Sequence, residues 1–211
     1  LAPDLPGHGL SGGAPLTSIG DMADWIDGLL ASLGVAQATL VGHSQGVLVA
    51  LETASRHPER VAALTLIAGA MAIPVNDALI DMSQSAPEKA FRMMTSWGHG
   101  PGAHKFDNTQ PGHAFLGYGR RVMAQNDGAA LHADLVACNS YDGGKDAAAS
   151  VTQPSLCLLA GKDKMTPVKF GRKMAEQISG AQCHVFERAG HFLPAEFPIE
   201  VNDAMAAFLS R

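Results

Sequence analysis

The chain has 211 residues, of which 46% are hydrophobic and 17% are charged. This composition fits one domain with a sizeable core and excludes a disordered chain. A net charge of −5 argues against a nucleic-acid-binding protein and against a polybasic membrane patch. No apolar run approaches the roughly 20 residues that a membrane-spanning helix needs. The three cysteines are scattered, which argues against a disulfide framework and favours a reducing, cytoplasmic compartment.

The first residues, from Leu1 to Gly9, are typical of a strand end that runs into a loop. The loop from Pro3 to Pro15 is rich in Gly and Pro and is therefore turn-prone. The segment lacks the pattern of a signal peptide. We therefore expect the sequence to begin inside a longer protein, whose upstream part could carry any targeting signal.

The first third of the chain alternates helices with apolar strands. Apolar residues recur at helical spacing over 19–33, after the capping pair Ser18 and Asp21 and before Gly34. A short strand is predicted over 38–41, a helix over 45–56 and a second strand over 61–68. The second strand is almost entirely apolar, as expected where both faces of a sheet are covered.

The alternation stops at about residue 74 and resumes at about residue 152. Helices over 86–96 and 119–135 are the best candidates in between. Beyond the interruption we predict strands over 154–160 and 182–187 and helices over 166–179 and 198–209. The pattern predicts an α/β fold with a mostly parallel central sheet flanked by helices, formed by residues 1–73 and 152–211. Residues 74–151 form an insertion.

A sharp turn is predicted where the first strand meets the second helix. Gly42, Ser44 and Gly46 form a GxSxG pattern between these two elements, a context that makes the short pattern meaningful. Such a turn strains the Ser backbone and projects its hydroxyl, and we expect bulky neighbours at the two glycine positions to clash. The backbone N–H of Gln45, at the helix N-terminus, is then suited to stabilise an oxyanion.

A serine nucleophile needs a base, and the base needs an acid to orient it. Asp163 follows the strand over 154–160, and His191 follows the last strand. The order Ser, Asp, His matches the chain order of one serine-hydrolase fold. All three residues are expected at the carboxyl edge of the sheet, where open α/β sheets bind ligands.

These residues resemble the α/β-hydrolase superfamily, and within it the small serine esterase-like members. The motifs that carry the resemblance are Pro3-Asp4-Leu5-Pro6-Gly7-His8-Gly9-x-Ser11, Gly42–Gly46, Gly161-x-Asp163 and Gly190-His191-Phe192-x-Pro194. The resemblance implies Ser44 as nucleophile, Asp163 as acid and His191 as general base. It also implies that residues 74–151 form a helical cap over the active site, and that the reaction is acyl transfer, commonly ester hydrolysis.

The chain departs from the family's pattern at its start. Family members carry a His-Gly loop upstream that supplies the second oxyanion N–H, and nothing here matches it. The first strands of the family's sheet are also absent, so the resemblance is to an N-terminally truncated hydrolase. We expect the parent protein to be active and this chain alone to be weak or inactive.

Other polar residues near these motifs have simpler interpretations. His43 is expected to pack behind the turn, and His8 to shape the first loop. Asp4 is expected in a turn, and Glu196 is expected to cap the final helix. Asp163 could also simply cap the helix that follows it.

The sequence offers possible pocket residues, and the histidines of the insertion show no metal-binding pattern. Met71 and Trp97, together with Met165 and Phe192, are candidates to line an acyl pocket, although such residues also seal a cap against a core. His99, His104, His113 and His132 lack HxxxH or HxH spacing, so we expect no metal and no other cofactor. An anionic substrate would need a cation such as Arg92, Arg120 or Arg121, which are more simply surface charges.

The sequence therefore predicts hydrolysis of a small-molecule carboxylic ester through an acyl-enzyme intermediate. The same residues would serve hydrolysis of a C–C bond or a lactone, or acyl transfer. A non-catalytic ligand-binding member of the same fold is the alternative from another class. No nucleic-acid or membrane partner is expected, and the sequence does not indicate an oligomeric state.

Overall fold

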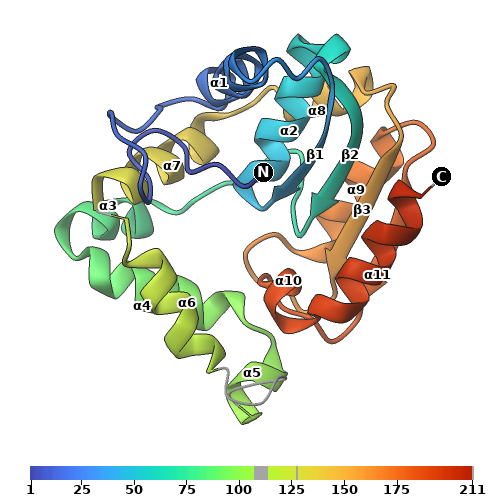
Figure 1. The fold of residues 1–211 in the computed structure, drawn as a ribbon. Coiled ribbons are helices and arrows are strands. Elements are labelled where there is room, and N and C mark those ends of the chain that lie inside the picture. The colour runs from blue at the N-terminus through green and yellow to red at the C-terminus, as the bar shows by residue number, and fades with distance from the viewer. Residues whose placement is uncertain (107–113, 127, 211) are drawn as a thin grey trace.

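The computed structural model describes residues 1–106, 114–126 and 128–210. Four strands form one sheet in the order β1 (Ala38–His43), β2 (Val61–Ile67), β3 (Ser155–Ala160) and β4 (Gln182–Phe186). Each neighbouring pair runs parallel, so the predicted mostly parallel α/β sheet is confirmed (Figure 1).

Helices connect and cover these strands. Outside the insertion they are α1 (Ile19–Ser32), α2 (Gln45–Arg56), the 3₁₀ turn η1 (Pro58–Arg60), α9 (Val168–Gln177), α10 (Leu193–Glu196) and α11 (Pro198–Leu209). The predicted cap of α1 is present, since the Asp21 backbone N–H donates to Ser18 Oγ at 3.0 Å. Within the described residues, no helix has both the length and the apolar character needed to cross a membrane.

The insertion is more helical than the sequence indicated. It contains α3 (Asp77–Ser85), α4 (Pro87–Gly98), α5 (Pro101–Phe106), α6 (Phe115–Met123), α7 (Gly128–Ser140) and α8 (Gly144–Ser150). The single helix predicted over 119–135 is wrong, because α6 ends at Met123 and α7 begins at Gly128. Asn126 and Gly128 lie at this break, and both residue types favour turns over helix interiors.

Helices cover both faces of the sheet at its central strand β3. Successive residues of a strand point to opposite sides, so alternate residues of β3 pack against different helices. In β3, Cys157 and Leu159 pack with α2, α8 and α9 on one face. Leu156 and Leu158 pack with α11 on the other face. This alternation explains why β3 is completely buried and why its sequence is a continuous apolar run.

The insertion helices have an apolar cluster of their own. Leu79 of α3, Phe91 of α4, and Leu131 and Leu135 of α7 are its main buried members. Figure 1 shows α3, α4, α5 and α6 as a group set apart from the strands. The last helix, α8, instead packs in the core beside the sheet, so the insertion ends structurally before residue 151.

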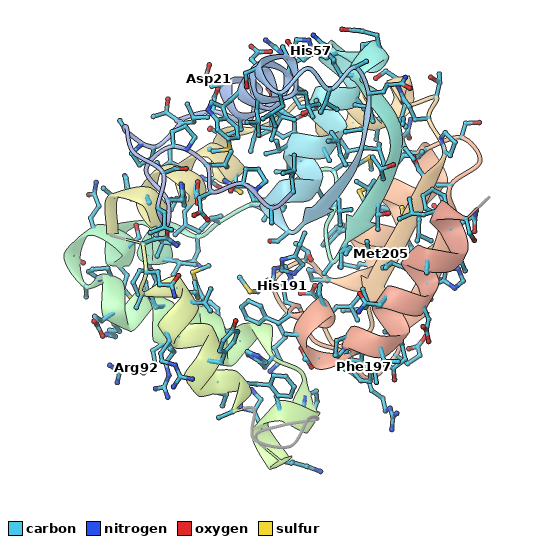
Figure 2. All side chains as sticks on the ribbon, in the orientation of Figure 1. Asp21, His57, Arg92, His191, Phe197 and Met205 are labelled. Atoms are coloured by element: carbon cyan, nitrogen blue, oxygen red, sulfur yellow. The ribbon has the colours of Figure 1, made fainter. Side chains whose placement is uncertain are left out.

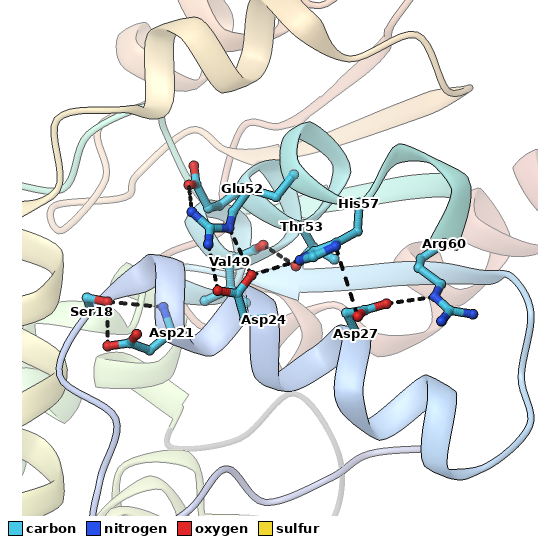
Figure 3. A network of polar contacts seen from close by, with 10 residues as sticks. Ser18, Asp21, Asp24, Asp27, Val49, Glu52, Thr53, His57 and Arg60 are labelled. Atoms are coloured by element: carbon cyan, nitrogen blue, oxygen red, sulfur yellow. Dashed lines mark hydrogen bonds and ion pairs between the residues drawn. The ribbon is translucent and has the colours of Figure 1, made fainter.

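Helix α1 is also joined to α2 by a network of polar contacts at the surface (Figure 3). Asp24 of α1 accepts two hydrogen bonds from Arg56, at 2.9 and 2.6 Å, and lies 2.8 Å from His57 Nε2. Asp27, one turn further along, accepts from Arg60 at 2.6 Å. Water screens such exposed pairs, so the apolar contacts of Ile19 and Met22 contribute more to this packing.

The turn from β1 into α2 has the strained backbone that the GxSxG pattern predicts. Ser44 has φ 55° and ψ −118°, and its backbone N–H donates to Ile67 O of β2 at 3.0 Å. A Cβ on Gly42 would lie 2.1 Å from Gly46 O, so only glycine fits there. A Cβ on Gly46 would meet nothing within 4 Å. The expected clash is therefore confirmed at Gly42 and is wrong at Gly46.

These two glycines form a matched pair for mutation. We expect Gly42→Ala to destabilise the protein by about 1–3 kcal/mol or more, because backbone atoms of α2 must move away. We expect Gly46→Ala to leave stability unchanged or slightly raised, since Ala favours helix over Gly. Chemical denaturation of both variants would check this, and equal losses would contradict the geometry.

The relative weight of core and surface contacts can be tested in the same way. We expect Leu158→Ala, which opens a cavity beneath α11, to cost about 2–5 kcal/mol of unfolding free energy. We expect Asp24→Ala, which removes the exposed ion pairs, to cost less than about 1 kcal/mol. Urea unfolding midpoints would compare the two, and a larger loss for Asp24→Ala would reverse this assignment.

Candidate active site

Asp163 and His191 form a buried pair at the carboxyl edge of the sheet. His191 Nδ1 lies 2.8 Å from Asp163 Oδ2, and the two residues are 2% and 8% exposed. Because a carboxylate only accepts hydrogen bonds, this contact assigns the ring proton to Nδ1 and leaves Nε2 as the acceptor. Figure 2 shows His191 between the strand ends and the insertion helices.

The carboxylate of Asp163 is held by further donors. Its Oδ1 accepts from the backbone N–H groups of Met165 and Thr166, each at 2.8 Å. Burial alone would raise the pKa of Asp163, but hydrogen bonds from His191 and Thr166 outweigh burial and lower that pKa. Asp163 therefore stays ionised. It contacts His191 and stabilises the turn before α9, but it does not cap that helix, whose N-cap is Pro167 with no side-chain hydrogen bond.

Thr166 is a site residue that the sequence analysis treated only as the start of a helix. Its hydroxyl lies 2.8 Å from Asp163 Oδ2 and 2.7 Å from Ala68 O, within reach of both acceptors. Ala68 itself has a positive φ of 45° at the end of β2. Thr166 thus links the loop of Asp163 to the neighbouring strand. The signal that could have found it is a Thr three residues after a loop Asp.

His43 supports His191 from behind, as expected. Its Nε2 donates to His191 O at 2.7 Å, and the two ring centroids are 4.8 Å apart. Burial, together with the neighbouring His191, lowers the pKa of His43 to about 4. His43 is therefore neutral at physiological pH, with its proton on Nε2, and acts as a packing group.

Ser44 lies on the same edge and lines a cavity of about 330 Å³. It is adjacent in the chain to His43, which contacts His191. Among the described residues, no hydrogen bond joins the Ser44 hydroxyl to the His191 ring, so the structure pairs Asp163 with His191 and places Ser44 nearby. Gln45, the first residue of α2, also lines the cavity, and its backbone N–H has no partner within the helix.

The cavity lies between this edge and the insertion. Its apolar lining comes mainly from the insertion and includes Leu79, Phe91, Met94, Trp97, Met123, Leu131 and Leu135. Trp97 and Met165 line it as expected, whereas Met71 and Phe192 do not. Met71 packs against the core beside α2, and the Phe192 ring lies 4.6 Å from the ring of His99. Both therefore join the insertion to the core instead of lining the cavity.

Glu196 does not cap α11, contrary to expectation. The N-cap of that helix is Phe197, and no side chain bonds there. Glu196 Oε2 instead accepts from the backbone N–H groups of Gly100 and Gly190, at 3.0 and 3.2 Å. Burial raises the pKa of Glu196, even though these backbone donors lower it. The carboxyl group thus joins the insertion to the loop of His191.

The histidines of the insertion do not form a metal site within the described residues. His99 Nδ1 and His104 Nε2 contact backbone carbonyls at 2.8 and 2.9 Å, and His132 lies 3.1 Å from Ser83 Oγ. His113 lies outside the described residues. In the described part of the chain, ligand atoms converge only at Asp27, His57 and Glu59, a surface group remote from the cavity in which Asp27 already pairs with Arg60.

Comparisons with known proteins agree with this arrangement. The chain is 29% identical over 204 residues to a pimeloyl-[acyl-carrier protein] methyl ester esterase of Neisseria meningitidis serogroup B, covering 90% of this chain and 74% of that protein. It is 27% identical over 220 residues to a 2-hydroxymuconate semialdehyde hydrolase of Pseudomonas putida, covering 93% and 71%. An enol-lactonase structure from Burkholderia xenovorans superposes with a TM-score of 0.89 at 22% identity, covering 99% and 79%.

The family comparison covers almost the whole chain. A sequence model described as "Alpha/beta hydrolase family" matches residues 1–204. This range contains all four strands and all of the cavity-lining residues. Together with the parallel sheet, this match shows that the chain belongs to the alpha/beta hydrolase family.

Proposed function

We propose that this chain is a serine hydrolase that cleaves carboxylic esters of small molecules through Ser44, His191 and Asp163. The observation that carries the proposal is the buried 2.8 Å hydrogen bond between His191 Nδ1 and Asp163 Oδ2. This bond commits one ring nitrogen as donor and leaves the other free to accept a proton. The strained turn of Ser44 lies at the same edge of the sheet.

The reaction follows from these roles. The Ser44 hydroxyl attacks the ester carbonyl while His191 Nε2 takes its proton, and the Asp163 carboxylate stabilises the imidazolium that forms. The backbone N–H of Gln45 stabilises the oxyanion. His191 then protonates the departing alkoxide, which leaves as the alcohol, and an acyl-Ser44 intermediate remains. Water activated by His191 releases the acid and regenerates Ser44.

The proposed reaction needs a contact between Ser44 and His191 and a donor to the oxyanion. Ser44 and His191 share no hydrogen bond in this structure, and we propose that bound substrate brings them into contact, as is common for catalytic hydrogen bonds in substrate-free enzymes. The backbone N–H of Gln45, a residue that lines the cavity, is the oxyanion donor that we propose. Removing one such donor typically costs about 100–1,000-fold in rate.

We further propose that α3–α7 serve as a cap that holds the acyl group. Two observations support this role: these helices form their own apolar cluster, and they supply most of the apolar lining of the cavity. The acyl group would extend from Ser44 towards Leu131 and Leu135 of α7.

Buried Cys138 and Cys157 are free thiols, which fits a reducing, cytoplasmic setting.

Hydrolysis of a C–C bond in an acidic substrate is the second candidate. It is favoured by Lys164, a cation that lines the cavity. Arg92, Arg120 and Arg121 do not line it, and Figure 2 shows Arg92 on the outer side of the insertion, away from His191. Turnover of a dienoic keto acid without turnover of simple esters would favour this candidate over ester hydrolysis.

The nucleophile can be tested by covalent labelling. We expect a fluorophosphonate probe to label the protein and to fail completely on Ser44→Ala, because the probe reacts only with an activated serine. Labelling is measured by mass spectrometry on the 211-residue chain and on the chain extended by any upstream coding sequence. Surface Ser140→Ala is the matched control. Labelling that persists in Ser44→Ala, or that is absent from both wild-type chains while they are folded, would refute the proposal.

The role of Asp163 can be separated from that of Ser44. We expect Asp163→Asn to lower kcat by about 10,000-fold, because an amide favours the wrong tautomer of His191. KM should change much less, since Asp163 does not line the cavity. Steady-state kinetics on p-nitrophenyl acetate would measure both constants. Unchanged kcat in a folded Asp163→Asn variant would exclude Asp163 as the orienting acid.

A further inference from the structure

An ion pair lies in the wall of the otherwise mainly apolar cavity. His8, from the first loop, places Nε2 2.9 Å from Asp134 Oδ2 on α7. Both residues line the cavity together with Ser44 and Gln45. The side chain of Gln45 donates to the backbone O of Asp134 at 3.1 Å, so this pair is attached directly to the turn that carries Ser44.

The contacts of His8 define its charge. Its Nδ1 lies 3.1 Å from Pro6 O and its Nε2 faces the Asp134 carboxylate, so both ring nitrogens face acceptors. Nδ1 therefore carries a proton, and a second proton lies between Nε2 and Asp134 Oδ2. Burial alone would lower the pKa of His8, but Asp134 and the backbone carbonyls outweigh it and raise that pKa. Burial raises the pKa of Asp134, although His8 lowers it. In either position of the second proton the pair has no net charge.

The carboxylate of Asp134 retains accepting capacity. Its Oδ2 contacts His8, whereas its Oδ1 is buried and has no hydrogen-bond partner among the described residues. The side chain as a whole is 23% exposed and lines the cavity, so a donor in the cavity would reach the carboxylate away from the buried Oδ1, where Oδ2 can accept a second hydrogen bond. Its neighbours on α7, Leu131 and Leu135, are apolar and cannot donate a hydrogen bond.

This arrangement bears on which acyl groups the cavity accepts. An unsubstituted alkyl chain would displace water from Asp134 without replacing its hydrogen bonds, which is costly for a carboxylate. A neutral hydroxyl donates to the carboxylate and removes that cost. An ammonium group gains less, because His8 already neutralises Asp134 and Lys164 also lines the cavity. A carboxylate on the substrate has no proton to donate to Asp134 and so cannot replace its hydrogen bonds.

We infer that the His8–Asp134 pair is the specificity-determining element of the cavity, and that it selects acyl groups carrying a hydroxyl over plain alkanoyl groups of the same length. This inference rests on the proposed hydrolase function and names the substrate class of that site. A site built to hydrogen-bond a substrate hydroxyl typically discriminates strongly against the analogue that lacks it, because its own polar group is then left unpaired.

The test compares p-nitrophenyl esters of straight-chain acids of four to eight carbons with their ω-hydroxy counterparts. For the chain length at which the hydroxyl reaches Asp134, we expect kcat/KM to favour the hydroxy ester by about 10–100-fold, the usual range for a hydrogen bond to a charged group. In Asp134→Leu the preference should disappear. Asp81→Asn, an exposed acidic position on α3 that does not line the cavity, is the matched control.

Binding gives a readout that does not depend on turnover. Calorimetry on Ser44→Ala, with methyl 6-hydroxyhexanoate and methyl hexanoate as probes, should show tighter binding of the hydroxy ester. The kinetic comparison of hydroxy and alkanoyl p-nitrophenyl esters can be made on the wild-type protein alone. It therefore remains a test even if Asp134→Leu misfolds.

The outcomes separate the two proposals. No fluorophosphonate labelling together with preferential binding of the hydroxy ester would refute the hydrolase function and support the cavity assignment. Labelling with a hydroxy-to-alkanoyl ratio near one at every chain length would overturn the inference and leave the hydrolase function in place. A preference that persists in folded Asp134→Leu would also overturn it.

Discussion

The hydrogen bond between His191 and Asp163 depends on constraints that converge from most of the fold. Asp163 is positioned by Thr166, whose hydroxyl also contacts the end of β2. The backbone N–H of His191 donates to Gly98 O, at the end of α4 in the insertion, and His43 of β1 donates to the carbonyl of His191. Three strand ends and one insertion helix thus hold a single imidazole, which limits its rotation.

The same packing leaves little freedom for change around the imidazole. A Cβ on Gly190 would lie 2.1 Å from Gly100 N, and a Cβ on Gly98 would meet the ring of Phe192 at 2.3 Å. The two loops therefore touch through backbone and ring atoms, with the Glu196 carboxylate between their N–H groups. A helix that lines the cavity is in this way fixed to the loop that carries the proposed base.

The parts of this arrangement that were predictable from sequence are those set by local chemistry. The parallel sheet followed from apolar runs such as β3, because burial on both faces requires a continuous run. Ser44, Asp163 and His191 were selected because they lie one, three and five residues after the ends of β1, β3 and β4, and their joint catalytic role stays a prediction. The contacts of Glu196 with Gly100 and of His8 with Asp134 were not predictable, because each joins residues distant in the sequence, and no local pattern specifies them. For the same reason Met71 and Phe192 were assigned to the cavity although they seal the junction beside it.

The insertion and the first loop are joined where they line the cavity, so under the proposed function they act together on substrate choice. His8 and Gly9 contact α7 and the turn before it, through Asp134 and Asn126, and all of these except Gly9 line the cavity. Gly98 and Gly100 contact the loop of His191. Under the proposed function, the insertion helices determine both which acyl group fits beside Ser44 and how firmly His191 is held. The cavity and the proposed base share supports, so substrates that move the insertion must also alter the position of His191. Many hydrolases share this fold and its sheet edge. Because the insertion contacts the loop of His191, a substitution in the insertion would change the position of His191 as well as substrate specificity.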